Sequence, residues 1–301
     1  MTSRAPADGA DPFVAHRNLL FTVAYEMLGS AADAEDVVQE TWLRWAEVDQ
    51  EQVQEPRAYL VRIVTRQALN RLRTLSRRRE DYVGEWLPEP LLTTPDVAED
   101  VELADSVSMA MLTVLETLGP TERAVFVLRE VFDLPYDEIA AAVGKTSAAV
   151  RQIATRARNH VAARRPRVEV DRDEQHAVVE SFLAAVQGGD LQALLDSLAP
   201  DVVLLADHGG VAQAIRKPLH GSEPVARLLA NFATFAPDGV IEPMWINGSL
   251  GARIDARGEV TAISLEVEDG RISKILVVRN PAKLTSLTEE FVLSRDAQGR
   301  S

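Results

Sequence analysis

The sequence predicts a multidomain protein in which two all-α domains precede a C-terminal α+β domain. Three observations favour this fold class. Apolar residues recur at helical spacing through the first half of the chain, a proline-containing acidic stretch interrupts them, and short alternating segments separated by X-Gly pairs fill the last third. With 301 residues, 46% of them hydrophobic, the chain is long enough for two or three domains with packed cores.

The first all-α domain is expected over residues 11–80. In "AADAEDVVQETWLRWAEV", Val38, Trp42 and Trp45 lie at positions i, i+4 and i+7, which predicts one buried helix face. The next helix is predicted to begin at Pro56, because proline is favoured in the first turn. Its predicted buried stripe consists of Leu60, Ile63, Val64 and Leu72.

The charged residues are unevenly distributed along a chain whose formal net charge is −14. The stretch from Arg57 to Arg79 contains eight arginines and no acid, whereas residues 81–105 contain eight acids and no base. Arginines are again frequent from Arg151 onward. Because the field near a surface follows the local charge, two basic helices predict binding to a polyanion despite the acidic total.

Residues 81–106 are predicted to be a linker. They hold three prolines, one glycine and the acidic run, which are all unfavourable for a continuous helix. Helices are expected to resume at about Val107 and to continue to Val161.

Residues 107–166 are predicted to form a second helical domain that contains a helix-turn-helix. Gly144 is expected to end the first helix of the motif in a left-handed conformation, and Thr146 or Ser147 is expected to cap the second. Residues near the start of the second helix would then meet base edges, and the arginines further on would meet phosphates. The expected inward residues are Ile139, Ala140, Val143, Val150, Ile153, Ala154, Ala157 and Val161. The outward residues are Ser147, Ala148, Arg151, Gln152, Thr155, Arg158 and Asn159.

The α+β domain is expected over residues 172–284, with two helices followed by strands. The segments "DVVLLAD" and "AQAIRKPL" are predicted to be extended, and three later strands are predicted to be joined at Arg257-Gly258 and Asp269-Gly270. Residues 285–301 are expected to be a tail that begins as a helix.

The composition also predicts several absences. The chain has no cysteine, so neither disulfides nor thiolate metal sites are expected, and the sequence predicts no metal or cofactor. No stretch approaches the roughly 20 apolar residues that span a bilayer, and the N-terminus lacks an apolar signal region. A cytoplasmic protein without a membrane partner is therefore expected.

Two segments resemble bacterial RNA polymerase sigma factors of the extracytoplasmic-function (ECF) group. "LLFTVAYEMLGSAADAEDVVQETWLRWAEV" resembles their second conserved region, and "LGPTERAVFVLREVFDLPYDEIAAAVGKTSAAVRQIATRAR" resembles their fourth. "WLPEP" in the linker resembles the subgroup with a fused, cone-shaped SnoaL-like (ketosteroid-isomerase-like) domain. The resemblance implies a non-enzymatic factor that directs core RNA polymerase to promoters, assists DNA melting and is regulated in cis by its C-terminal domain.

The resemblance also implies which residues contact polymerase and DNA. The second region would dock on the β′ clamp helices of the polymerase core, and the fourth region would meet the β flap. The residues expected to bind the core are Asp33, Asp36, Gln39 and Glu40. Those expected at the promoter −10 element are Arg62, Arg66, Gln67, Asn70, Arg71 and Arg73. Those expected at the −35 element are Ser147, Ala148, Arg151, Gln152, Thr155 and Arg158.

Regulatory contacts are expected between the linker and the C-terminal domain. The subgroup usually carries Asp-Gly-Gly-Gly-Lys and Asn-Pro-Asp-Lys motifs, whereas this chain has Asp207-His208-Gly209-Gly210-Val211 and Asn280-Pro281-Ala282-Lys283. An exposed Trp-Leu-Pro cluster is unfavourable in water, so the linker is expected to dock on that domain. The residues expected in this contact are Trp86, Leu87, Pro88, Asp207, Gly209, Gly210, Asn280, Pro281 and Lys283.

Two other functions remain open from the sequence. A DNA-binding regulator could sense a small molecule in a C-terminal pocket, and a small-molecule ligand of that domain is therefore an open partner. An isomerase tethered to DNA-binding helices would need an acid–base group inside the domain. The candidates for that group are Asp207, His208, Trp245 and Asn247.

Overall fold

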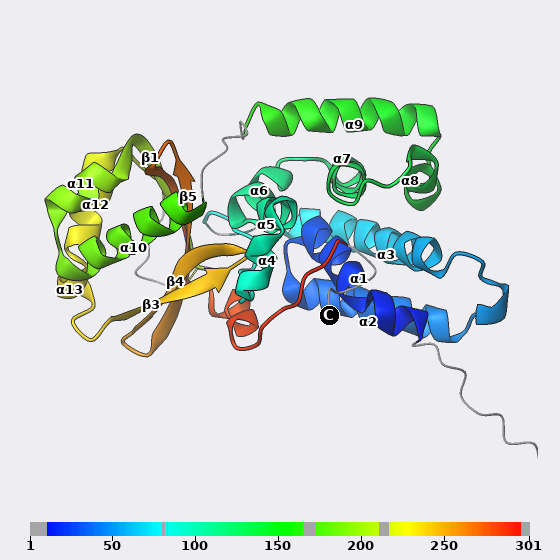
Figure 1. The fold of residues 1–301 in the computed structure, drawn as a ribbon, viewed down its shortest axis with the longest axis horizontal. Coiled ribbons are helices and arrows are strands. Elements are labelled where there is room, and N and C mark those ends of the chain that lie inside the picture. The colour runs from blue at the N-terminus through cyan, green and yellow to red at the C-terminus, as the bar shows by residue number, and fades with distance from the viewer. Residues whose placement is uncertain (1–10, 80–81, 83, 165–171, 211–216, 296–301) are drawn as a thin grey trace, which may run out of the picture. The chain divides into compact units, whose positions relative to one another are not determined.

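The structure is a computed structural model that describes residues 11–79, 82, 84–164, 172–210 and 217–295. The chain divides into two compact units, each built from separate stretches of sequence (Figure 1). The first unit holds residues 1–73, 119–157 and 293–301, and the second holds 74–118 and 158–292.

The first unit begins with three helices. They are α1 (Pro12–Leu28), α2 (Ala31–Ala46) and most of α3 (Pro56–Arg79), with a short 3₁₀ turn η1 (Gln50–Gln52) between the last two. Asp11 caps α1 by accepting a hydrogen bond from the Phe13 amide at 2.9 Å. Gly29 ends the helix with φ 66°, a left-handed conformation that glycine adopts without steric cost.

The inner face of α2 differs from the predicted one at a single residue. Val38 and Trp45 are buried as predicted, but Trp42 is 47% exposed. The prediction was wrong there because the buried stripe runs through Ala34, Val37, Val38, Thr41 and Trp45, and Trp42 lies about 100° around the helix from Thr41. In α3, Leu60, Val64 and Leu72 are buried, whereas Ile63 is only half-buried.

The rest of the first unit is helical as well. It comprises α7 (Pro120–Phe126), a π-helical turn η2 (Val127–Val131), α8 (Tyr136–Val143) and most of α9 (Ser147–Ala162). Arg123 of α7 is buried and donates from Nε to the carbonyl of Glu26 in α1 at 2.9 Å. Burial lowers the pKa of Arg123 to about 9, against the opposing effect of the nearby Glu26. This contact joins the second helical domain to the first.

The second unit begins with helices where the sequence predicted a linker. The expected helix start near Val107 was wrong, because α4 (Pro95–Glu99) and α5 (Val101–Val107) precede α6 (Met109–Leu115). Pro95 occupies the first turn of α4, and Asp100 caps α5 by accepting from the Leu103 amide at 3.1 Å. The acidic residues that led to the prediction of a linker are therefore also residues that cap helices or lie in their first turns.

The α+β domain contains one six-stranded sheet with strand order β2-β1-β6-β5-β4-β3. Its helices are α10 (Arg172–Gly188), α11 (Leu191–Ser197), α12 (Ser222–Ala230) and α13 (Phe232–Phe235). Its strands are β1 (Leu198–Asp207), β2 (Leu219–His220), β3 (Val240–Ile246), β4 (Ser249–Ala256), β5 (Glu259–Glu268) and β6 (Arg271–Val278). The two predicted hairpins are confirmed, with positive φ at Arg257, Gly258, Asp269 and Gly270.

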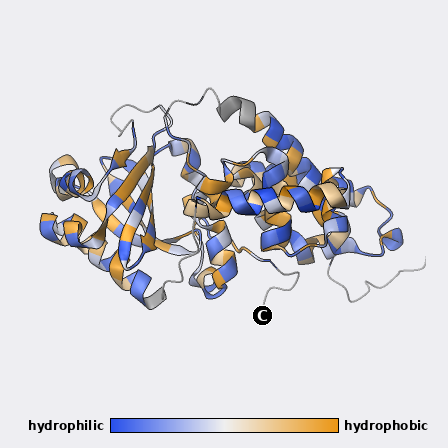
Figure 2. Cartoon of the chain, turned by 90° about the horizontal axis from the view of Figure 1, so that it is seen from above, coloured by the Kyte–Doolittle hydropathy of each residue, from blue (hydrophilic) through white to orange (hydrophobic). Residues whose placement is uncertain are grey.

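The two faces of this sheet are covered differently. One face packs on α10, α11 and α12 through a core that includes Phe182, Leu194 and Val225. The other face carries Leu276 and Val278 against a second cluster of buried residues. In Figure 2 the strands are largely hydrophobic in colour, which fits a sheet that is buried on both faces. That second cluster includes Leu87, Met109, Leu284 and Leu287.

The segment after β6 differs from the expected helix. Two short 3₁₀ turns, η3 (Pro281–Lys283) and η4 (Thr285–Leu287), are followed by irregular chain. The Ser294 amide then donates to Thr22 Oγ1 of α1 at 3.0 Å, within the first unit. Most of the predicted "AQAIRKPL" strand lies outside the described residues, as does the end of the tail. None of the helices in the described ranges is long and apolar enough to cross a membrane.

Candidate functional site: a linker clamp and two DNA-facing surfaces

A buried carboxylate at the end of β1 holds the chain that precedes α4. Asp207 is 0% exposed and accepts hydrogen bonds on both oxygens. The Tyr82 hydroxyl donates to Oδ1 at 2.5 Å, and the Leu87 amide donates to Oδ2 at 3.0 Å. Burial, followed by the hydrogen bond to Asp207, raises the pKa of Tyr82, so its proton stays in this contact at neutral pH.

Lys283 of η3 is the counter-ion of Asp207. Its Nζ lies 2.6 Å from Asp207 Oδ2 and donates to the Leu87 carbonyl at 2.5 Å. The same ammonium lies 3.1 Å from the centroid of the Trp86 ring. Since the Lys283 side chain is only 8% exposed, the charge is satisfied by an anion, a carbonyl and an aromatic face instead of water. These groups are called the linker clamp below: Tyr82, Trp86, Leu87, Asp207, Asn280 and Lys283.

The motif residues that make these contacts are the same in this chain as in the family motifs. Asn280 donates from Nδ2 to the Tyr82 hydroxyl at 2.9 Å and accepts from the Ala282 amide. Gly209 has φ 57°, and a Cβ there would lie 2.5 Å from Asn280 Cγ, so a side chain is excluded at this position. Of the three changed positions, His208 and Ala282 do not bond to the linker backbone, and Val211 lies outside the described residues.

His208 fills the space that the family's glycine would leave beside the linker. Its ring is 5% exposed and lies against the backbone of Gly84, and its Nδ1 accepts from the Gly210 amide at 3.1 Å. Its Nε2 has no hydrogen-bond partner among the described residues. The His208 ring therefore packs against Gly84 in this structure. Pro281 begins η3, and Pro88 is buried next to Leu87.

A second anchor joins the linker to the edge strand β3. The Thr93 amide donates to the Trp245 carbonyl at 3.0 Å, and the Asn247 amide donates to the Leu91 carbonyl at 3.0 Å. The Asn247 side chain accepts from the Leu91 amide at 2.8 Å and donates to the Val107 carbonyl at 2.7 Å. The linker thus adds main-chain pairing to an exposed sheet edge, as in β-strand addition.

The four acid–base candidates of the C-terminal domain are mostly engaged in structural contacts. Asp207 holds the linker, Asn247 is fully buried between Leu91 and Val107, and the Trp245 ring packs edge-on against His176. Within the described ranges, no cluster of three or more His, Asp or Glu side chains is placed to hold a metal ion.

The predicted polymerase-facing acids of α2 contact the predicted DNA-facing side of α3. Arg71 Nη2 lies 2.5 Å from Asp33 and 3.3 Å from Asp36, and Gln67 donates to Glu40 at 2.8 Å. The hydrogen bond to Asp33 raises the pKa of Arg71. Gln39 is exposed on the same helix. The structure therefore brings together two residue sets that the sequence assigned to different partners.

The other predicted −10 residues make contacts within the first unit. Arg66 donates to the carbonyls of Ala141 and Ala142, at 2.8 and 3.4 Å, at the end of α8. Arg62 lies over the Tyr59 ring at 5.2 Å, and Arg73 has Asn70 as a hydrogen-bond acceptor at 3.3 Å. The helix α3 thus contacts α8, the first helix of the helix-turn-helix.

The helix-turn-helix has the geometry that the sequence predicted. Gly144 ends α8 with φ 70°, and Thr146 is the capping residue of the two candidates, because its hydroxyl accepts from the Ala149 amide. The inward residues of both helices are buried. Ser147 is half-buried and donates to Asp137, whereas Arg151 lies over the Tyr136 ring at 5.5 Å. The exposed outward residues are Ala148, Arg151, Gln152, Thr155, Arg158 and Asn159.

Sequence reasoning missed two parts of this site. Tyr82 was overlooked, although an aromatic residue four positions before Trp86 was a usable signal, and the two rings pack edge-on at 4.9 Å. The pairing of the linker with β3 was also missed. It involves only residues 91–93, and three residues are too few to show the alternating pattern of a strand.

These features define a class of protein: a helical factor that contains a helix-turn-helix and a basic helix predicted to face DNA, together with a linker that an α+β domain binds. The comparisons with known proteins agree. The Sigma-70 region 2 model matches residues 13–78 and the Sigma-70, region 4 model matches residues 108–161. The chain belongs to the family of ECF RNA polymerase sigma factors, which are non-enzymatic transcription initiation factors that bind core RNA polymerase and promoter DNA.

The similarity extends over nearly the whole chain. It is 37% identical over 290 residues to ECF RNA polymerase sigma factor SigJ of Mycobacterium tuberculosis, covering 91% of this chain and 92% of SigJ. It is 32% identical to the probable sigma factor SigI of the same species, covering 92% and 95%. The crystal structure of M. tuberculosis SigJ matches with a TM-score of 0.73 and 34% identity, covering 91% of this chain and 98% of that one. The predicted resemblance to a sigma factor with a fused C-terminal domain is confirmed.

Proposed function

We propose that this sigma factor is regulated in cis by the linker clamp. In this proposal, residues 11–80 bind the β′ clamp helices and the −10 element, and residues 107–166 bind the −35 element and the β flap. Residues 172–284 are the regulatory domain, which holds part of the linker (residues 81–106), and residues 285–301 form the tail.

The paired charges of α2 and α3 support the proposed polymerase docking. Asp36 is 60% exposed on its side chain, so a basic partner helix can approach it from solvent. A cation of the partner would compete with Arg71 for Asp33 and Asp36, and a displaced Arg71 would be available for a DNA phosphate. Docking on polymerase would in this way free a cation of the proposed −10 helix to bind DNA.

The regulatory part of the proposal rests on one observation: Asp207 and Lys283 both bind the backbone of Leu87. The Leu87 amide and carbonyl are both bound by buried charged groups, and Leu91 and Thr93 pair with the edge of the sheet. By family resemblance, the linker threads the interior channel of polymerase in the holoenzyme. Because the same backbone groups cannot be bound in both places, the clamp restrains the free protein, and its release favours the active state.

Run-off transcription with purified core polymerase tests the regulatory part. We expect Lys283→Met to raise transcription several-fold, because it removes the ammonium that holds the Leu87 carbonyl. Lys274→Met is the matched control, since Lys274 lies on β6 and pairs with Glu266 at 2.5 Å without contacting the linker. Equal transcription by both variants and the unaltered protein, with unaltered binding to core enzyme, contradicts the proposal.

Co-purification with core polymerase tests the docking part separately. We expect Asp36→Arg to abolish the complex, because it places a cation where a basic partner helix would approach. Glu47→Arg makes the same change of charge at the C-terminal end of α2, outside the proposed surface, and should leave the complex intact. A complex that survives the Asp36 substitution rules out this docking face.

A further inference from the structure

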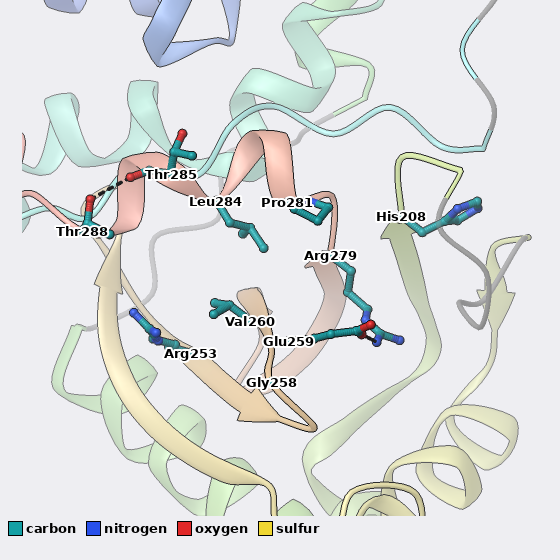
Figure 3. A pocket seen from close by; sticks show the side chains of 10 residues that line it. All are labelled: His208, Arg253, Gly258, Glu259, Val260, Arg279, Pro281, Leu284, Thr285 and Thr288. Carbon is teal, nitrogen blue, oxygen red and sulfur yellow. Dashed lines mark hydrogen bonds and ion pairs between the residues drawn. The ribbon is translucent and has the colours of Figure 1, made fainter.

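The C-terminal domain has a cavity of about 330 Å³ that the proposed regulation does not use (Figure 3). Arg253 pairs with Ala262 across β4 and β5, and Ala262 and Val260 pack on the sheet face opposite α10, α11 and α12. The cavity therefore lies outside the layer between sheet and helices, which is filled by side chains such as Phe182 and Leu194.

Two guanidinium groups reach the cavity from different elements. Arg253 comes from β4 and Arg279 from the residue after β6. Carboxylates hold both in position: Arg253 binds Asp255 through Nε and Nη2 at 2.7 and 2.9 Å, and Arg279 Nη2 binds Glu259 at 2.5 Å. The pair with Asp255 uses Nε and Nη2, and Nη1 of Arg253 has no hydrogen-bond acceptor among the described residues. A pre-oriented guanidinium with spare donors suits a carboxylate ligand.

The remaining walls are largely apolar. Val260 and Leu284 point toward one another across the cavity in Figure 3, and Pro281 lies beside them. Thr285 and Thr288 complete the rim, and the Thr288 hydroxyl donates to the Thr285 carbonyl at 2.8 Å. An apolar cavity of this size with a few fixed polar groups is typical of sites for small organic ligands.

We propose that this cavity binds a small organic carboxylate with an apolar body. The carboxylate meets Arg253 at one wall, and the apolar body lies between Val260 and Leu284. A neutral amide of the same shape is disfavoured, because its carbonyl oxygen is a weaker acceptor for Nη1 of Arg253 than a carboxylate oxygen is.

The position of the cavity connects it to the linker clamp, and this part of the inference rests on the proposed function. Pro281 and Leu284, which line the cavity, flank Lys283 in the same turn. Lys283 reaches Asp207 and the Leu87 carbonyl. A ligand that packs on Leu284 stabilises this turn in the conformation that grips the linker, so binding and clamping reinforce one another.

Calorimetry and hydrogen exchange on the full-length protein test the proposal without relying on transcription. The probes are phenylacetate and hexanoate, with phenylacetamide as the neutral counterpart. For ligands this small we expect a Kd of about 1 mM for the carboxylates. The Leu87 and Leu91 amides, which donate to Asp207 and Asn247, should exchange several-fold more slowly with ligand bound.

Two variants locate the site. Arg253→Gln should weaken carboxylate binding about tenfold or more. Arg227→Gln removes an exposed ion pair with Glu223 on α12 of the same domain and should leave binding unchanged. The proposal is overturned if neither carboxylate binds at about 10 mM, roughly ten times the expected Kd. Equal binding of the amide, or binding that Arg253→Gln does not weaken, overturns it as well. Binding with unchanged exchange at Leu87 and Leu91 overturns the coupling to the linker.

Discussion

The protein uses ion pairs in two different environments. Asp207 and Lys283 in the linker clamp are almost fully buried, whereas Arg71, Asp33 and Asp36 on α2 and α3 form a network open to solvent, in which the Arg71 side chain is 40% exposed. A buried charge that loses its partner cannot be rehydrated, but an exposed one can exchange its partner for water or for another protein. The clamp is therefore suited to hold a segment, and the α2–α3 network to exchange partners.

The largest expected effect is that of Lys283→Met on stability. The substitution leaves the Asp207 carboxylate buried without a counter-ion, which costs about 3–5 kcal/mol of unfolding free energy. Chemical unfolding followed by tryptophan fluorescence measures it, because Trp86 lies against Lys283. The double variant Asp207→Asn, Lys283→Met has no unpaired charge and should be more stable than the single variant. A double variant that is less stable than the single one contradicts this account of the clamp.

Asn247→Ala should have the next largest effect, about 2–4 kcal/mol, because it leaves the buried Leu91 amide and Val107 carbonyl without their side-chain partner. Asn247 also has φ 53°, a conformation that alanine adopts at a cost. Asn247→Gly loses the same hydrogen bonds but avoids that backbone strain, so it should be more stable than the alanine variant by about 1 kcal/mol. Thermal unfolding of both variants measures the difference, and equal stabilities would show that the backbone conformation is not strained.

Arg71→Gln should change stability by less than about 1 kcal/mol, since the pairs it removes are exposed. Its effect should appear in binding instead: the slope of log affinity against log salt for promoter DNA should fall by about 1 in the holoenzyme. Titrations of holoenzyme with promoter DNA at several salt concentrations measure the slope. A loss of stability comparable to that of Lys283→Met would show that the α2–α3 network holds structure as firmly as the linker clamp does.

The smallest expected effect concerns pH and the first unit. Burial, followed by the nearby charge of Arg57, lowers the pKa of His16 below its ordinary value of 6.5. The unfolded chain therefore binds this proton more readily than the folded one, and stability falls as the pH falls from above 6.5 through the lower, folded pKa. His16→Gln should flatten this dependence in unfolding experiments between neutral and mildly acidic pH. An unchanged pH dependence in the variant would mean that other groups cause it.

Individual residues show where sequence reasoning succeeds. Gly144 and the inward residues of α9 were predicted correctly, and Thr146 was one of the two predicted caps, because a left-handed glycine, helical spacing and a cap are local properties. Trp42 was misplaced because a large apolar residue does not have to be buried. The acids of α4 and α5 were taken for a linker because caps and solvated charges use the same residue types.

The sequence by itself determined the helices of the first unit, the two hairpins and the family, since each follows from residues close together in the chain. Only the tertiary structure decided the partners of the charged groups. Asp207 meets Leu87 and Lys283 across 120 and 76 residues of sequence, and Arg71 meets Asp33 across 38. No local pattern encodes such pairings, because they depend on how packed elements bring distant side chains within a few ångströms and exclude water from them.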